Sequence, residues 1–237
     1  DGPNIFATVL GVTSIGAAAT CALGNAKVLD PSFDFNAISS SLLSIPCFAI
    51  GVLSISSVYN NYAKSQLKFH ALGLIPVIVM ALSYGKMSNV IQNTSIVAIC
   101  VFLGVFNSKD MEHDVKWNMP TIVMACNVVI LFLFCATPFL MTPGELFPQY
   151  DGLVSTDTFR FLIGSAFVYV LPMAAAVANN RASELQPWWA ACLFFNTTIH
   201  MLTDPIDYQN AITCAVFGVI QISSAYLYNA KTTSKSE

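Results

Sequence analysis

Long apolar runs separated by short polar segments dominate the chain. Eight runs cover residues 5–24, 38–58, 69–85, 90–106, 118–141, 160–178, 187–203 and 209–228. None contains Lys, Asp or Glu, and Arg160 stands at the edge of the sixth. A membrane-spanning helix needs about 20 predominantly apolar residues. The pattern therefore predicts an all-α, polytopic transmembrane helical bundle of about eight spans, forming a single domain over residues 1–237.

Two alternatives bear on this topology. The third and fourth runs are short, and a re-entrant pair there would lower the number of spans, so the expected range is six to eight. A transmembrane β-barrel requires strands that alternate apolar and polar residues, and these runs do not alternate. Only helices and closed barrels satisfy the backbone inside a bilayer. The runs are accordingly expected to be helices.

Composition agrees with a membrane location. Hydrophobic residues make up 55% of the 237 residues and charged residues only 10%, whereas a soluble domain carries about 25% charged residues. This balance argues against nucleic-acid binding, a secreted disulfide scaffold and a disordered chain. The seven Cys residues lie in apolar stretches without CxxC spacing, so neither a disulfide framework nor a metal site is expected.

The basic residues predict an orientation. With eight spans, one side of the membrane holds Lys64, Lys68, Lys109, Lys116, Arg181, Lys231 and Lys235, and the other holds Lys27, Lys86 and Arg160. The positive-inside rule then places both termini on the side of the cytosol, matrix or stroma. A start at Asp1 is consistent with removal of an organellar presequence. We expect an organellar protein, in the plastid thylakoid rather than the mitochondrial inner membrane.

Two polar junctions recur at nearly half the chain length. Asn60-Asn61 closes the second run and Asn179-Asn180 closes the sixth, and a Gln-Asn pair opens both the fourth and the eighth. Such spacing is typical of an internal duplication. The predicted halves are residues 1–110 and 117–230, and four helices in each half would make them parallel repeats. Their interface is the first place to look for a site.

No catalytic pattern is present, and we predict no enzyme. The spans lack the ionisable groups that mark proton relays, and GxSxG and HExxH are absent. The remaining candidates are neutral: His70, His200, Asn127 and Gln221. They could bind a pigment such as chlorophyll or a carotenoid, or simply form hydrogen bonds between helices. His70 and His200 lie near opposite faces, which argues against a haem held between them.

Other residues bear on packing. Small residues in the first span (Gly11, Gly16, Ala17, Ala18, Ala19) and the sixth (Ala174, Ala175, Ala176, Ala178) predict close helix contacts. Pro46, Pro76, Pro138 and Pro172 fall inside spans, where they could kink a helix. Trp189 and Tyr150 lie near span ends and resemble interfacial anchors. The long loop 142–159 could lie along the interface, dock on a partner or bind a cation.

The sequence favours two functions over a third, a membrane enzyme acting on lipid, which would have only surface Asp, Glu and His side chains to work with. The first is a non-catalytic accessory subunit of a larger organellar membrane complex, in contact with lipids and neighbouring subunits and holding pigment or lipid in a photosynthetic assembly. The second is a small transporter or channel for a neutral solute, built on the repeat. The absence of buried charge fits both, because a scaffold needs no buried charge and a neutral solute requires none.

Overall fold

The computed structural model describes residues 2–105, 114–137 and 140–233, and all regular structure in these ranges is helical. The elements are α1 (Gly2–Ala22), α2 (Ala26–Leu29), α3 (Ala37–Tyr59), α4 (Ala63–Ser83), α5 (Met87–Val105), α6 (Met119–Ala136), α7 (Pro143–Leu146), η2 (Pro148–Tyr150), α8 (Thr156–Gly164), α9 (Phe167–Ala178), α10 (Ala182–Leu202) and α11 (Tyr208–Thr233). The predicted all-α bundle is confirmed.

Seven of the described helical segments are long and apolar enough to cross a membrane, with α8 and α9 counted as one. This number lies within the expected range of six to eight. Helix α10 is also 21 residues long and runs alongside the others, but no stretch of it is apolar enough to count among the seven. The third and fourth runs form α4 and α5, continuous helices of 21 and 19 residues rather than a re-entrant pair.

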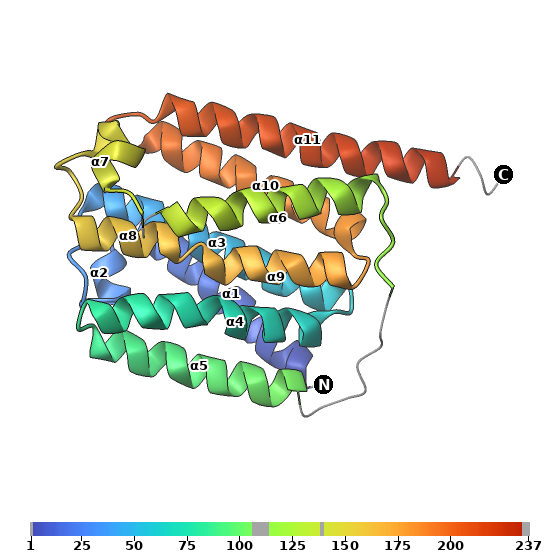
Figure 1. Cartoon of the computed structure of the whole chain (residues 1–237), viewed down its shortest axis with the longest axis horizontal. Coiled ribbons are helices and arrows are strands. Elements are labelled where there is room, and N and C mark those ends of the chain that lie inside the picture. The colour runs from blue at the N-terminus through green and yellow to red at the C-terminus, as the bar shows by residue number, and fades with distance from the viewer. Residues whose placement is uncertain (1, 106–113, 138–139, 234–237) are drawn as a thin grey trace.

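The long helices run roughly along one direction (Figure 1). Both termini and the α3–α4 and α9–α10 turns lie at one end of the bundle, here called the termini end; α2, α7 and η2 lie at the other, the cap end. Within the chain's halves α1 packs on α3, α4 on α5 and α10 on α11, while α4 packs on α9 and α10 on α3 across the halves.

The two Asn-Asn junctions form turns of the same shape. Asn61 and Asn180 have φ of 59° and 55°, in the left-handed region that Asn tolerates better than most residues. In each turn the next residue donates its backbone N–H to the carbonyl five positions earlier, at 2.8 Å. This match and the reciprocal packing across the halves are compatible with a duplication, and the repeat over 1–110 and 117–230 stays a prediction.

Small residues bring α1 and α3 together, as expected. A Cβ on Gly11 would lie 2.7 Å from Ile55 Cγ1, and a Cβ on Gly51 would lie 2.6 Å from Ile15 Cγ1. In lipid such close approach replaces the hydrophobic driving force that water provides. The predicted stripe is only partly used, because Ala18 is buried whereas Gly16 and Ala19 are exposed.

The sixth predicted span is interrupted. It begins at Thr156, earlier than predicted, and α8 ends at Gly164 before α9 begins at Phe167. At the interruption, the backbone N–H of Ala166 and of Val168 each donate to the carbonyl three residues earlier, the tighter spacing of a 3₁₀ turn. Of the four prolines within predicted spans, Pro172 lies in α9 beyond this interruption, and Pro138 lies outside the described residues.

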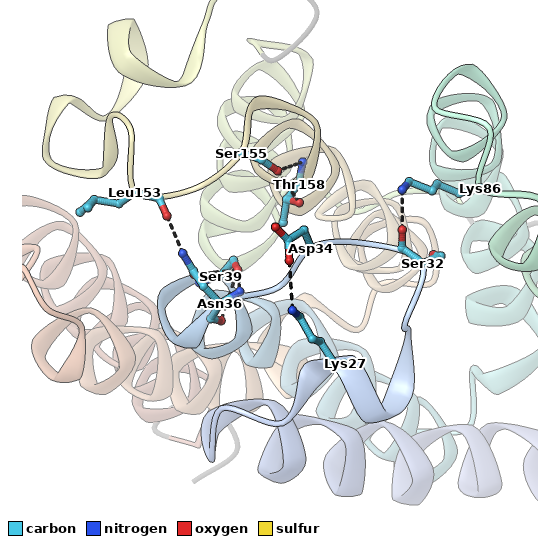
Figure 2. Close-up of polar contacts among 9 residues, drawn as sticks. All are labelled: Lys27, Ser32, Asp34, Asn36, Ser39, Lys86, Leu153, Ser155 and Thr158. Atoms are coloured by element: carbon cyan, nitrogen blue, oxygen red, sulfur yellow. Dashed lines mark hydrogen bonds and ion pairs between the residues drawn. The ribbon is translucent and has the colours of Figure 1, made fainter.

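Polar contacts tie the segments of the cap end together, and one of them joins the two halves of the chain (Figure 2). Asn36 caps α3 by accepting the backbone N–H of Ser39 at 2.9 Å, and its amide also donates to the Leu153 carbonyl. Lys27 pairs with Asp34 at 3.0 Å on the surface. Loop 142–159 thus packs on the bundle, and its Val154 and Phe159 side chains are buried.

Candidate functional site

A cavity of about 260 Å³ lies between α3, α6, α8–α9, α10 and α11 and is covered at the cap end by η2 and the residues around it. Most of its wall is apolar, with Leu42 from α3, Ile130 from α6 and Phe217 from α11 as examples. The interruption between α8 and α9 borders it through Ala166. In membrane transporters, broken helices commonly line the substrate site.

Four of the neutral polar residues in the cavity wall concern the argument here: Asn127, Trp189, Asn196 and His200. Tyr150, Tyr169, Asn210 and Thr213 also line the cavity. Along α10, Trp189, Asn196 and His200 share one face because their spacing follows the helical period. Asn127 lies near the middle of α6 and is 5% exposed. A neutral amide is therefore placed near the middle of the bundle, with the imidazole close to the cap end.

Four polar atoms of these residues are buried without a hydrogen bond. His200 Nδ1 has a carboxylate oxygen 3.2 Å away, and the other three have no such neighbour: Asn127 Nδ2, Trp189 Nε1 and Asn196 Oδ1. A buried polar group without a partner costs about 1–3 kcal/mol. Native proteins rarely keep such groups, and each one calls for an explanation such as a ligand or water. The concentration of three of them in one cavity wall indicates a site that a ligand completes.

A polar cluster around the single carboxylate of Asp207 lies beside the cavity, toward the cap end. Asp207 is 2% exposed, and its Oδ2 accepts from the Asn210 amide at 2.6 Å and from the Tyr150 hydroxyl at 3.2 Å. His200 Nδ1 lies 3.2 Å from the same oxygen. Asp207 also caps α11, since Oδ1 accepts the backbone N–H of Asn210 at 3.2 Å, and the helix dipole favours a negative charge there.

The surroundings of Asp207 and Tyr150 set the protonation states of these two groups. Burial acts to raise the pKa of Asp207, but hydrogen bonds from Asn210 and the nearby His200 outweigh it, so the pKa lies below its ordinary value. Burial raises the pKa of Tyr150 to about 12. At neutral pH Asp207 is therefore an acceptor and Tyr150 a neutral donor, and the carboxylate lies next to the imidazole of His200.

Of the four candidate residues from the sequence, Asn127 and His200 line the cavity, whereas His70 and Gln221 do not. His70 Nδ1 donates to the carbonyl of Val168 at 3.2 Å. In a regular helix residue 172 would donate to that carbonyl, but Pro172 has no N–H. His70 thus compensates for the proline and anchors α4 to α9. Gln221 is fully buried in α11, with both amide atoms unpartnered.

Sequence reasoning missed several residues of the site. Trp189 and Tyr150 resemble interfacial anchors by position, yet they are 3% and 1% exposed because α10 and η2 pack inside the bundle. In the sequence Asp207 is one of several acidic residues in the loops between apolar runs. Its position three residues before Asn210, at the start of an apolar run, is an N-cap signal that could have marked it as ordered.

The described part of the chain holds no group of three His, Cys, Asp or Glu side chains arranged to bind a metal ion. Its seven Cys residues are free thiols, and Cys192 lies in the cavity wall while Cys126 is exposed on α6. The polar groups of the cavity wall are neutral amides, hydroxyls, an indole and an imidazole. One carboxylate, that of Asp207, lies behind the imidazole.

No protein family model, curated protein or solved structure matches this chain. The function proposed below therefore rests on the cavity, its unpartnered polar groups and the helices that form it.

Proposed function

We propose that the protein binds a small neutral molecule in the cavity and carries it across the membrane. The molecule has an apolar body and at least one hydrogen-bonding group such as a hydroxyl, carbonyl or amide. The observation that carries the proposal is the set of buried, unpartnered polar atoms on Asn127, Trp189 and Asn196 in a largely apolar wall. A ligand group that hydrogen-bonds to them would remove their desolvation cost.

The lack of charged side chains in the described cavity wall and the volume of the cavity limit which ligands can bind. Asp207 contacts three neighbouring side chains behind the cavity wall. Among the described residues that line the cavity there is no Asp, Glu, Lys or Arg. An ion entering this apolar space would lose its hydration without compensation. The volume of about 260 Å³ is slightly below the range of about 300–1,000 Å³ typical of small-molecule sites. A small solute suits it better than a chlorophyll macrocycle.

The accessory-subunit prediction is the second candidate. Its support is the exposed apolar residues on the outer helices, among them Val9 on α1, Phe102 on α5 and Val216 on α11, which neighbouring subunits or lipid tails would cover equally well. An organellar, photosynthetic setting with bound pigment belongs to this candidate. The accessory-subunit function would be favoured over transport if a membrane protein copurified in mild detergent at fixed stoichiometry and the complex showed visible absorption bands.

Transport is tested in proteoliposomes with acetamide and 1,2-propanediol as neutral probes and tetramethylammonium as a charged one. Stopped-flow light scattering is expected to show faster entry of a neutral probe than in protein-free vesicles, and no faster entry of the cation. Cys192→Phe fills part of the cavity and is expected to lower the protein-dependent rate about tenfold, the effect of losing roughly 1.4 kcal/mol of binding. Cys192→Leu should give an intermediate rate.

The matched control is Cys126→Phe, which adds the same side chain at the exposed cysteine on α6. It is expected to leave the rate within about twofold of the wild type, as surface substitutions usually change free energies by less than about 0.5 kcal/mol. Equal rates for the two Phe variants, or no protein-dependent entry of either neutral probe, would contradict the proposal.

A further inference from the structure

A second polar group lies beyond the cavity, toward the termini end. Gln186 of α10 and Gln221 of α11 are fully buried, and Ser224 is 1% exposed. Gln186 Nε2 donates to Ser224 Oγ at 3.1 Å and approaches the Pro120 carbonyl at 3.5 Å, while Gln186 Oε1 has no partner. Both amide atoms of Gln221 are unpartnered. We call Gln186, Gln221 and Ser224 the amide seam.

The amide seam continues the cavity along the same helix faces. On α11 the cavity residues Asn210, Cys214 and Phe217 are followed at helical spacing by Gln221 and Ser224. From Phe217 to Gln221 is one turn, a rise of about 6 Å. On α10, Gln186 stands one turn before the cavity residue Trp189.

The seam also leads to the termini end. Pro120, whose carbonyl faces Gln186, lies in the first turn of α6. Asn118, just before that turn, donates its amide to the Tyr228 hydroxyl at 3.3 Å. Tyr228 lies one turn beyond Ser224 on α11. Polar groups thus follow one another from the cavity to the end of the bundle, between α6, α10 and α11.

Ordinary helix–helix hydrogen bonding does not account for Gln221. Polar residues between membrane helices contribute about 0.6 kcal/mol each because they find partners. Gln221 has none among the described residues, so it costs stability where Leu or Met would not. A buried amide with a free donor and a free acceptor suits a passing group that both accepts and donates, such as a carboxamide or a hydroxyl.

We propose that the amide seam is the closed half of the transport path, a second site that binds the solute's amide or hydroxyl group between the cavity and the termini end. This inference rests on the proposed function. In the structure the cavity lies beside Asn127 and Trp189, whereas the side chains of Gln186 and Gln221 are fully buried. The amide seam selects a neutral solute that can both donate and accept, since neither glutamine carries a charge.

The test is Gln221→Met, which keeps the length of the side chain and removes both amide atoms. Acetamide entry into proteoliposomes is expected to fall about tenfold, equivalent to about 1.4 kcal/mol, because the solute loses a hydrogen bond to Gln221 during passage. The thermal unfolding temperature is expected to stay equal or rise, since two unpartnered groups are removed. Gln209→Met, an exposed glutamine on the same helix, is the control and should match the wild type.

A second readout separates the seam from the cavity. In a Trp117→Phe, Trp188→Phe background, Trp189 reports access to the cavity, and its quenching by acrylamide should be the same with Gln221 or Met at position 221. If acetamide entered at the wild-type rate in Gln221→Met, the amide seam would not be a binding site on the transport path, and the proposal for the cavity would be unaffected. If Cys192→Phe and Cys126→Phe gave equal entry, the proposed function itself would fail, whatever Gln221→Met did.

Discussion

Replacing Gly73 by Ala is expected to destabilise the protein by about 1–3 kcal/mol, the usual cost of overpacking a well-filled interior. A Cβ at Gly73 would lie 2.5 Å from the carbonyl oxygen of Phe167 and 3.0 Å from the Cα of Val168. Both atoms belong to the backbone at the start of α9, so no side-chain rotation relieves the clash. Helix α4 would have to move away from α9, and the hydrogen bond from His70 would lengthen. Thermal unfolding in detergent micelles measures the loss.

The matched control is Gly16→Ala on α1. A Cβ there meets no atom within 4 Å, and Ala is the better helix former. This variant is expected to be as stable as the wild type or slightly more stable. A Gly73→Ala protein that unfolded at the temperature of Gly16→Ala would show that α4 and α9 are not in contact as described.

Removing the His70 imidazole should also be costly, and the loss should depend on a proline. His70→Leu leaves the buried carbonyl of Val168 without its donor at 3.2 Å, at an expected cost of about 1–3 kcal/mol. Pro172→Ala restores a backbone N–H that can donate to the same carbonyl. The double variant His70→Leu, Pro172→Ala should therefore recover much of the stability lost in His70→Leu.

The comparison is a double-mutant cycle, with Pro172→Ala alone as the fourth corner. The two sites are expected to couple by about 1 kcal/mol or more, within the range of 0.5–3 kcal/mol for residues that share one interaction. Additive effects would mean that His70 stabilises the bundle by some means other than the Val168 carbonyl, and would reopen its role as a ligand.

The fold was predictable because the bilayer imposes a simple rule. Runs of about 20 apolar residues must become helices there, and the polar junctions at Asn60 and Asn179 mark where helices end. The interruption at Ser165–Ala166 was not predictable in this way. It falls within a continuous apolar run and depends on contacts with α4, whose Gly73 and His70 are distant in sequence.

The candidate site was only half predictable. Asn127 and His200 stand out as polar residues in apolar runs, and both line the cavity. His70 and Gln221 stand out for the same reason, yet one bonds a neighbouring backbone and the other lies in the amide seam. Trp189 gives no such signal, because an indole at a span end looks the same whether it faces lipid headgroups or a cavity.

Quenching of Trp189 fluorescence shows whether the cavity admits neutral molecules and excludes ions. In the Trp117→Phe, Trp188→Phe protein, acrylamide is expected to quench the fluorescence of Trp189. Iodide is expected to have little effect, because an ion would lose its hydration in an apolar space. Adding Cys192→Phe should reduce the quenching by acrylamide, because the Phe side chain fills part of the cavity. Equal quenching by acrylamide and iodide, or acrylamide quenching that Cys192→Phe left unchanged, would mean that the cavity is not a selective site for neutral molecules.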